Sequence, residues 1–294
     1  HNLNETVLHR DVRPRNVILE NCIDDASCKV RMINYDMSWH EGAKGEDANS
    51  PNSQIGYQAP ELISSRKSKI SREASVDVYG VGMTMYYMAS GKNPPIGGGN
   101  AQDWHQEVGS KLAGLMCQNW RSLNKRLERL IMLCTNVHPS QRPSMGHVIS
   151  ELNQLYEVVR GEYKKISADF WAEEVLSRAG YAYRQSTDEK SYRIDLLEGR
   201  ETIIFGNLTE NSVDAQINIS AAGKENWENI KKRLKERFEE SINRMTQAGW
   251  KKLPDTGAFA REARLSFRID VTDLEQKIDQ KARALGDVIQ AMKL

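Results

Sequence analysis

Apolar residues lie on almost all sides of the helix that the segment from Ala74 to Ser90 would form. A helix that is apolar all round has to be buried on every side, so its domain must be built around it. Gly91 follows directly, and glycine is common just after a helix because it adopts left-handed backbone angles without strain. The sequence therefore predicts a mainly helical first domain with a buried central helix that ends at Gly91.

Other elements of this domain are predicted from shorter patterns. Apolar runs at 17–19 and 30–33, separated by polar residues, predict a small β-hairpin. Residues 39–54 are rich in small and polar residues without periodicity, which predicts a long surface loop. Helices are expected over 101–118 and 121–135, then a break at Pro139–Pro143, and then an amphipathic helix from Ser144 past Val159 with Val148, Leu152, Leu155 and Val159 on one stripe.

The pattern changes at the polar junction Gly161–Lys165, where we place a domain boundary between residues 1–163 and residues 166–294. Beyond it, Ser167 is expected to cap a helix that ends at Gly180. A second, longer helix is expected over 227–245, because its apolar residues recur on one face of an otherwise charged segment.

Three segments of the second half alternate apolar and polar residues as half-buried strands do: 192–196, 213–219 and 265–271. Glu198–Gly199 predicts a tight turn between two strands. The spacing Thr272-x-x-Glu275 is that of a capping box and predicts the start of a last helix. The second domain is thus expected to be a small α+β domain, an antiparallel sheet with helices on one face.

The composition excludes several classes of protein. Of the 294 residues, 41 are Lys or Arg and 40 are Asp or Glu, and the resulting net charge of +1 provides no overall field for nucleic acid or an anionic membrane. No apolar run is long enough to cross a bilayer, and the first residues do not resemble a signal peptide. The four cysteines show no metal-ligand spacing, which predicts free thiols in a cytoplasmic protein.

Five motifs occur in the first half in a characteristic order. They are His9-Arg-Asp-x-Arg-Pro-x-Asn16, Ile33-Asn-Tyr-Asp36, Gly56-Tyr-Gln-Ala-Pro-Glu61, Ser75-Val-Asp-Val-Tyr-Gly-Val-Gly82 and His138-Pro-Ser-Gln-Arg-Pro-Ser144. In this order they resemble the catalytic loop, the metal-binding triplet, the end of the activation segment, the central helix and the last turn of eukaryotic-type Ser/Thr protein kinases. The resemblance covers roughly residues 1–157 and implies the fold of a kinase C-terminal lobe.

The resemblance implies roles for the residues of the first motif. Asp11 would be the catalytic base, which orients the substrate hydroxyl for phosphoryl transfer. Arg13, where most Ser/Thr kinases have Lys, would offer a fixed cation to the transferred phosphate. Asn16 would supply an amide oxygen to Mg²⁺. Arg10 would bind a phosphorylated activation loop, for which Ser50 and Ser53 are the candidate phosphorylation sites.

Other matched residues are expected to hold the lobe together. Glu61 and Arg142 correspond to the buried ion pair of the family, and the loss of one partner should destabilise the lobe by several kcal/mol. Asp77 is expected to bind backbone amides of the catalytic loop from the central helix. His9 is expected to hold that loop, and for Asp11 too we keep a purely structural role open as an alternative.

The sequence departs from an active kinase at three positions and lacks one lobe. Asn34 stands where the family has its metal-binding aspartate, and a neutral amide would hold Mg²⁺ more weakly. Asp36 replaces the glycine of the triplet and is either a substitute metal ligand or a solvated carboxylate. Gln54 lies where these kinases usually have a threonine that bonds the catalytic aspartate. No glycine-rich loop or strand lysine is present, so we expect the chain to be a trimmed piece of a longer protein.

Two main hypotheses follow. The first is a Ser/Thr kinase that transfers phosphate from Mg-ATP to a protein substrate once an N-terminal lobe is supplied, with weakened activity because of Asn34. The second is a pseudokinase scaffold whose second domain recruits a protein partner or forms a homo-oligomer. A third hypothesis makes residues 166–294, which resemble no family, the functional part and the lobe its regulator.

Overall fold

The computed structural model divides the chain into two compact units, which are described separately. Unit 1 comprises residues 1–117 and 123–155, and unit 2 comprises residues 118–122 and 156–294. The cut therefore lies inside a helix, before the polar junction at which the sequence pattern changes. The structure describes residues 7–22, 28–41, 55–64, 72–94, 120–185, 192–195, 201–209, 211–220, 227–254, 256–258 and 262–292.

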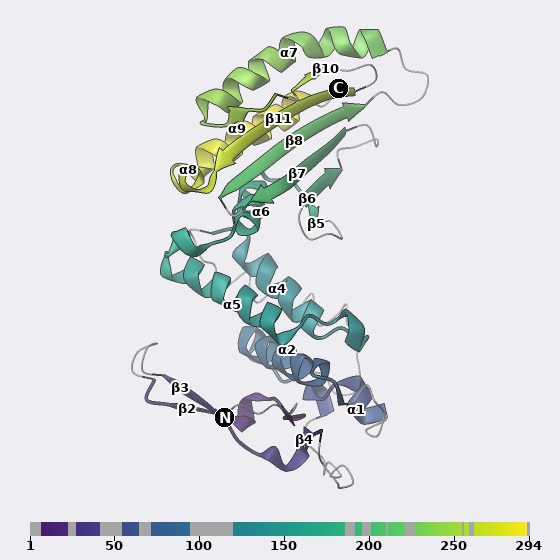
Figure 1. Cartoon of the computed structure of the whole chain (residues 1–294), viewed down its shortest axis with the longest axis vertical. Coiled ribbons are helices and arrows are strands. Elements are labelled where there is room, and N and C mark those ends of the chain that lie inside the picture. The colour runs from purple at the N-terminus through teal and green to yellow at the C-terminus, as the bar shows by residue number, and fades with distance from the viewer. Residues whose placement is uncertain are drawn as a thin grey trace. The chain divides into compact units, whose positions relative to one another are not determined.

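Unit 1 is built around the helix α2, Ser75–Ser90 (Figure 1). It ends as predicted at Gly91, which has a φ of 72° and whose N–H donates to Tyr87 O at 2.8 Å. The other α-helices described in this unit are α1 (Pro60–Ser64), α4 (Leu123–Cys134) and α5 (Met145–Arg160). Their buried apolar side chains form one core with those of α2: Tyr57, Ala59, Leu62, Val76, Val78, Tyr79, Met83, Met85, Tyr86, Leu130, Ile131, Cys134 and Val148.

Two short antiparallel ribbons lie at the N-terminal end of unit 1. The predicted hairpin is confirmed as β2 (Val17–Glu20) paired with β3 (Lys29–Met32). The strand β1 (Val7–Leu8) pairs with β4 (Trp39–His40). Trp39 and His40 were expected to begin the long loop, and this expectation is wrong because both pair with β1. The remainder of that loop, the expected turn at Glu198–Gly199 and the helix at 101–118 lie outside the described residues.

Unit 2 contains an antiparallel sheet. Its strand order is β10-β11-β8-β7-β6-β5, and β9 pairs with β11. The strands are β5 (Arg184–Gln185), β6 (Tyr192–Asp195), β7 (Glu201–Thr209), β8 (Ser212–Ser220), β9 (Lys251–Lys252), β10 (Gly257–Ala258) and β11 (Glu262–Asp270). The helices are α6 (Ala168–Ala179), α7 (Trp227–Gln247), α8 (Val271–Glu275) and α9 (Ile278–Met292).

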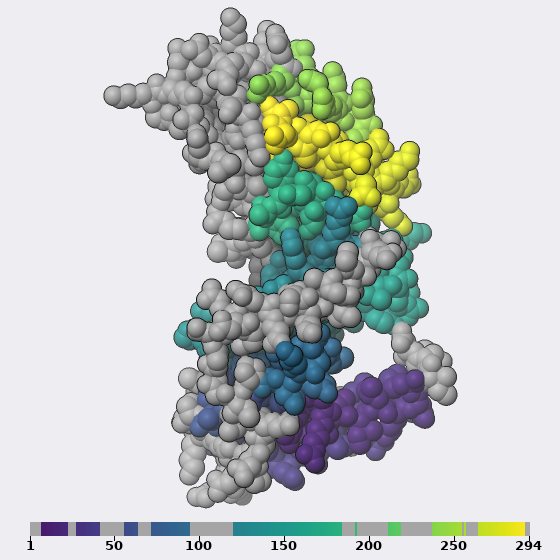
Figure 2. Space-filling view, turned by 180° about the vertical axis from the view of Figure 1, so that it is seen from behind, coloured from purple at the N-terminus to yellow at the C-terminus, as the bar shows by residue number. Residues whose placement is uncertain are grey.

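The alternation seen in the sequence decides which face of this sheet is covered. Val213, Ala215 and Ile217 of β8 are buried, as are Leu265, Phe267 and Ile269 of β11. The helices α6, α7 and α9 cover one face of the sheet (Figures 1 and 2). On β8 and β11 the intervening positions are polar, and they include an ion pair in which Arg268 donates to both carboxylate oxygens of Asp214 at 2.6 and 2.7 Å.

Three details of the sequence-based expectations are wrong. Val159 is two-thirds exposed and Val158 is buried instead, so the apolar stripe of α5 turns by one position near its end. Thr272 does not begin the last helix. It lies inside the short helix α8, whose N-cap position is Asp270, and Lys277, with a φ of 57°, separates α8 from α9. Cys22 and Cys28 form a disulfide across the end of the β2–β3 hairpin rather than remaining free thiols.

Ser167 occupies the predicted N-cap position of α6, but its hydroxyl donates to the Asp169 side chain and does not accept a backbone N–H of the first turn. Gly180 ends that helix with a φ of 81°, as predicted. Among the described residues, no helix is both long enough and apolar enough to cross a lipid bilayer.

Candidate functional site

The loop from His9 to Asn16 is attached to the central helix of unit 1 by Asp77. The two carboxylate oxygens of Asp77 accept the backbone N–H groups of His9 at 2.8 Å and of Arg10 at 2.7 Å. Gly80, one turn further along α2, approaches the loop so closely that a side-chain Cβ there would lie 2.8 Å from Val12 O. The central helix thus holds the loop through the hydrogen bonds of Asp77, and the lack of a side chain at Gly80 allows the loop to pack closely against the helix.

Burial raises the pKa of Asp77, and the two backbone N–H groups oppose that rise. The hydrogen bonds are therefore the interactions that keep a charged carboxylate inside the lobe.

His9 connects the loop to the segment that contains Asn34. Its Nε2 donates to Ile33 O at 2.9 Å, and its Nδ1 accepts the backbone N–H of Asp11 at 3.3 Å. These two contacts require the neutral imidazole with its proton on Nε2. The ring also packs on Tyr35, with 4.8 Å between the ring centroids.

Arg10 adopts a left-handed backbone conformation with a φ of 63°, and its side chain is buried. Its guanidinium carbon lies 5.7 Å from the centre of the Trp39 ring on β4, within the range of a cation–π contact. Ser50 and Ser53, the candidate phosphorylation sites that Arg10 would bind when modified, lie outside the described residues, as does Gln54.

Asp11, Arg13 and Asn16 converge at the end of this loop. Asp11 Oδ2 accepts Arg13 Nη2 at 3.0 Å and Asn16 Nδ2 at 2.8 Å, and the same amide nitrogen also donates to Asp11 O at 2.8 Å. Asp11 Oδ1 is buried and accepts no hydrogen bond from the described residues. Asn16 is fully buried in the short 3₁₀ helix Pro14–Asn16. The loop thus presents one carboxylate oxygen without a partner beside an arginine.

Asn34 completes a chain of amides with a defined direction. Its Nδ2 donates to Asn16 Oδ1 at 2.8 Å, while Asn16 Nδ2 donates to Asp11. Because a carboxylate only accepts, Asn16 must turn its NH₂ group toward Asp11 and its oxygen toward Asn34. Asn34 has a φ of 62°, a left-handed conformation that asparagine tolerates better than most residues.

This arrangement does not fit the Mg²⁺ site that the family resemblance implies. The Asn16 oxygen, which would bind the ion, is occupied by an N–H group of Asn34. Position 34 supplies no negative charge, and Mg²⁺ sites in proteins are usually built on one or two carboxylates. Asp36 is exposed in the 3₁₀ helix Tyr35–Met37 and makes no hydrogen bond or ion pair with a described residue, so the structure does not bring it to the other two.

Glu61 and Arg142 form a bidentate ion pair in unit 1. Arg142 Nη1 and Nη2 donate to the two oxygens of Glu61 at 2.6 and 2.9 Å. Arg142 also donates to Asn136 O at 2.7 Å and to Ser75 O at 3.0 Å, and its guanidinium lies 4.9 Å from the centre of the Tyr79 ring. Every side of the buried guanidinium is thus occupied, which ties α1, α2 and the turn before α5 together.

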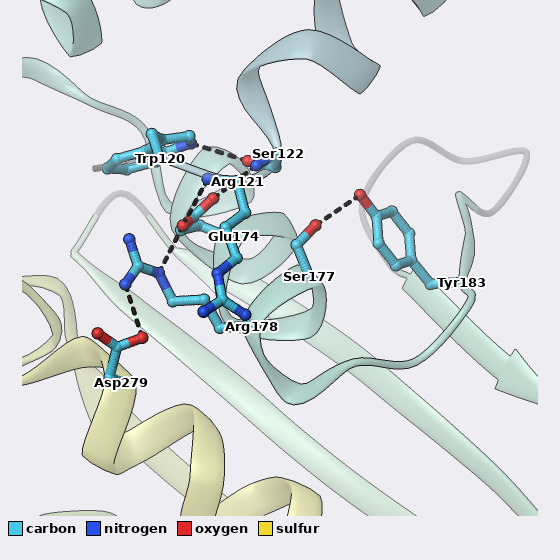
Figure 3. A network of polar contacts seen from close by, with 8 residues as sticks. All are labelled: Trp120, Arg121, Ser122, Glu174, Ser177, Arg178, Tyr183 and Asp279. Atoms are coloured by element: carbon cyan, nitrogen blue, oxygen red, sulfur yellow. Dashed lines mark hydrogen bonds and ion pairs between the residues drawn. The ribbon is translucent and has the colours of Figure 1, made fainter. Parts of the chain in front are cut away.

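Unit 2 contains a polar cluster that the sequence did not reveal (Figure 3). The fully buried Glu174 of α6 accepts the backbone N–H groups of Arg121 at 2.9 Å and Ser122 at 2.8 Å. The same carboxylate accepts Arg178 Nε at 2.5 Å, and Arg178 Nη1 donates to Asp279 at 2.8 Å. The i,i+4 spacing of Glu174 and Arg178 was the one signal available in the sequence, and it is too common to identify a site.

Comparison with known proteins places the first half of the chain among the kinases. The family model described as protein kinase domain matches residues 1–153. L-type lectin-domain containing receptor kinase I.3 of Arabidopsis thaliana is 29% identical over 163 residues, which are 51% of this chain and 23% of that protein. Human receptor-interacting serine/threonine-protein kinase 3 is 26% identical over 177 residues, 54% of this chain and 31% of that protein.

The match to the rat protein of the same name also extends into the second half of the chain. It is 25% identical over 232 residues, 71% of this chain and 44% of the relative. The chain therefore spans less than half the length of each of these relatives.

Proposed function

The chain belongs to the protein kinase domain family over residues 1–153, and from that premise we propose that it is a kinase-type C-terminal lobe that serves as a protein-binding scaffold. In this proposal residues 1–163 form the lobe, and residues 166–294 form an appended α+β domain that recruits a protein partner. The observation that carries the proposal is the hydrogen bond from Asn34 Nδ2 to Asn16 Oδ1 at 2.8 Å.

In this hydrogen bond the Asn34 amide occupies the Asn16 oxygen that would otherwise bind an ion. In kinases the transfer of a phosphoryl group depends on metal ions that neutralise charge developing on the phosphates. Here the buried Asn16 oxygen is already satisfied by a neutral donor, so an ion would have to displace it and would gain no charge from position 34. Because charge stabilisation is usually the largest catalytic contribution at such sites, its loss should reduce phosphoryl transfer severely.

The loop is nevertheless well formed, which supports a structural use of the residues that match the catalytic motif. Asp77 and His9 hold its backbone, and the side chain of Asp11 is paired with Arg13 and Asn16. All of these contacts form between protein groups and need no ion. A scaffold needs such a rigid lobe, and it does not need the metal.

The proposal is tested by the response of the chain to magnesium. We expect the thermal unfolding midpoint of the wild type to be the same in ATP with and without MgCl₂. In Asn34→Asp the donor to Asn16 Oδ1 is replaced by a carboxylate, and this variant should show a rise in the midpoint with MgCl₂. Asp36→Asn, which removes an exposed carboxylate nearby, is the matched control and should behave like the wild type. A magnesium-dependent rise in the wild type would contradict the proposal.

Phosphoryl transfer by a Ser/Thr kinase is the second candidate function, and one observation favours it. Asp11 Oδ1 is buried and has no hydrogen-bond partner among the described residues. A catalytic base needs such an open oxygen to accept the proton of a substrate hydroxyl. Arg13, bound to the other oxygen of Asp11 at 3.0 Å, would lie beside the reacting group. Radiolabel transfer from ATP to a protein substrate, measured with the wild type and with Asp11→Asn, decides this point, since equal incorporation by the two proteins eliminates catalysis.

The recruiting role of the second domain is tested separately. Residues 156–294 contain most of unit 2, and protein partners captured by the full chain should be lost when substitutions alter exposed residues of this unit. Light scattering of the full chain tests whether a second copy of the chain is such a partner.

A further inference from the structure

A polar pocket of about 420 Å³ lies within unit 2, between the end of α6 and the outer face of α9. Three arginines line it, Arg121, Arg178 and Arg283, and we call it the arginine pocket. Its other polar walls are Tyr181, Asp279 and Asp287. Its volume is in the range of small-molecule sites, whereas its lining is far more polar than is usual for such sites.

The two carboxylates of the pocket do not neutralise all of its arginines. Asp279 accepts Arg178 Nη1 at 2.8 Å, and Asp287 lies 3.9 Å from Nη1 of Arg244, an arginine outside the pocket that also donates to Glu240 at 2.6 Å. The side chains of Arg121 and Arg283 are exposed and make no hydrogen bond or ion pair with the described residues. The pocket therefore holds two guanidinium groups that form no ion pair with the described residues.

The buried carboxylate of Glu174 fixes the floor of this pocket. It binds the backbone N–H of Arg121 and the Nε of Arg178, so the main chain of one arginine and the side chain of the other are held by the same group. Figure 3 shows the two arginine side chains next to each other, with Asp279 on the far side of Arg178. Glu174 is fully buried, and its charge offsets that of Arg178 from the protein side of the pocket.

We propose that the arginine pocket binds a phosphate monoester. Guanidinium groups present paired N–H donors that match the oxygens of a phosphate, and hydrogen bonds between charged groups are the strong ones. A dianionic group can bind both of the arginines that form no ion pair, whereas a single carboxylate would bind only one. The pocket is a partly open recess and not an extended basic stripe, and the net charge of the chain is only +1, so a nucleic-acid backbone is not the ligand.

Calorimetric titration of the full chain tests the proposal. The probes are O-phospho-L-serine, a short peptide containing one phosphoserine, inorganic phosphate and succinate. We expect both phosphoserine probes to bind at least tenfold more tightly than succinate. Tighter binding of the peptide than of the free amino acid would identify a phosphorylated protein as the source of the ligand, and equal binding would identify a small phosphate ester.

Arg121→Gln and Arg283→Gln should each weaken the binding of O-phospho-L-serine about tenfold, and the double variant should abolish it. Neither side chain has a partner among the described residues, so both variants should keep the thermal midpoint of the wild type. Lys252→Gln, an exposed lysine on β9 that does not line the pocket, removes the same charge and should bind within about twofold of the wild type.

Several results would overturn the proposal. These are no binding of either phosphoserine probe by the wild type, equal affinity for succinate, or unchanged affinity in both arginine variants. A loss of affinity in Lys252→Gln equal to that in the arginine variants would show a general effect of charge and would also overturn it. None of these outcomes depends on the magnesium response or on phosphoryl transfer, so this site and the proposed scaffold function succeed or fail separately.

Discussion

Glu61 in unit 1 and Glu174 in unit 2 are both buried glutamates that bind an arginine. Among the described residues, Glu61 binds only the arginine side chain, whereas Glu174 also binds backbone N–H groups. Glu61 gives both its oxygens to the guanidinium of Arg142, a residue far away in the sequence. Glu174 divides its oxygens between an arginine one helical turn away and two backbone N–H groups before α4.

The difference shows two uses of a buried carboxylate. In unit 1 the pair is a bridge between elements, and each charge exists to compensate the other. In unit 2 the carboxylate satisfies backbone groups that would otherwise be buried without partners, and the arginine is also turned toward a pocket. Four predictions can break or sharpen this contrast.

Arg142→Ala should have the largest effect and lower the free energy of unfolding of unit 1 by about 3–5 kcal/mol, because it leaves Glu61 buried and unpaired. Hydrogen exchange of peptides from α1 and α2 measures the change in this unit alone. Arg31→Ala, which breaks an exposed pair with Glu20 in the same unit, is the control and should leave the free energy of unfolding almost unchanged. A loss below about 1 kcal/mol for Arg142→Ala would show that the pair does not bridge the lobe.

Glu174→Gln should destabilise unit 2 by about 2–4 kcal/mol. The amide keeps the shape of the side chain, but its NH₂ group faces a donor where the carboxylate accepted one, and Arg178 loses a buried countercharge. Exchange of the backbone N–H groups of Arg121 and Ser122 should accelerate most. Asp279→Asn, at the exposed end of the network, is the matched control, with a cost of about 0–1 kcal/mol. Equal effects of the two variants would mean that the backbone contacts contribute nothing.

Alkaline pH should lower the free energy of unfolding of unit 1 through Tyr79, whose ring stacks against the guanidinium of Arg142. Burial raises the pKa of Tyr79 to about 12, against about 10 for an unfolded tyrosine. Between pH 10 and pH 12 the unfolded state thus loses this proton while the folded state keeps it, and the free energy of unfolding falls by about 2 kcal/mol.

Tyr79→Phe should remove this part of the alkaline loss, as measured by urea unfolding at a series of pH values. Burial also raises the pKa of Tyr57 to about 12, so some of the loss should remain in that variant. A pH profile unchanged by Tyr79→Phe would show that Tyr79 does not titrate differently in the two states.

Gly286→Ala should have the smallest effect and the opposite sign, stabilising unit 2 by about 0.5–1 kcal/mol. Gly286 lies within α9, and a Cβ there would meet Ala179 O at 3.4 Å, an ordinary contact, so the higher helix propensity of alanine should dominate. Gly82→Ala in α2 is the counterpart in unit 1, where a Cβ would lie 2.6 Å from Cys134 Cβ and should destabilise. Thermal unfolding of both variants measures the contrast, and the same sign in both would contradict it.

Sequence patterns were informative where a local rule governs the structure. The largely apolar segment after Ala74 and the alternation in 213–219 and 265–271 predicted a buried helix and two strands that the structure contains. Helical periodicity failed at Val159, because packing buries Val158 instead. The capping pattern failed at Thr272, because β11 ends at Asp270 and the next helix begins at Val271. The disulfide between Cys22 and Cys28 was missed because pairing depends on how the hairpin brings the two ends together.

In the candidate site, too, some features follow from the sequence pattern and others only from the tertiary structure. A motif was enough to select Asp11, Asn16 and Asn34 and to expect that they lie around one place, since each stands at a fixed position in a recognisable string. It could not say that Asn34 donates to Asn16, because the direction of a hydrogen bond between two amides depends on the third partner, Asp11. For Glu174 and the arginine pocket no motif existed at all.

By itself the sequence determined the kinase family of the first half, the periodicity of its helices and strands, and which residue types are available at each motif position. Only the tertiary structure decided which of these polar groups satisfy one another and which are left to a ligand. The physical reason is that periodicity and propensity act over a few residues, whereas a buried charge is compensated by whatever group the fold brings to it, as Arg142 is brought to Glu61 and the backbone of Ser122 to Glu174.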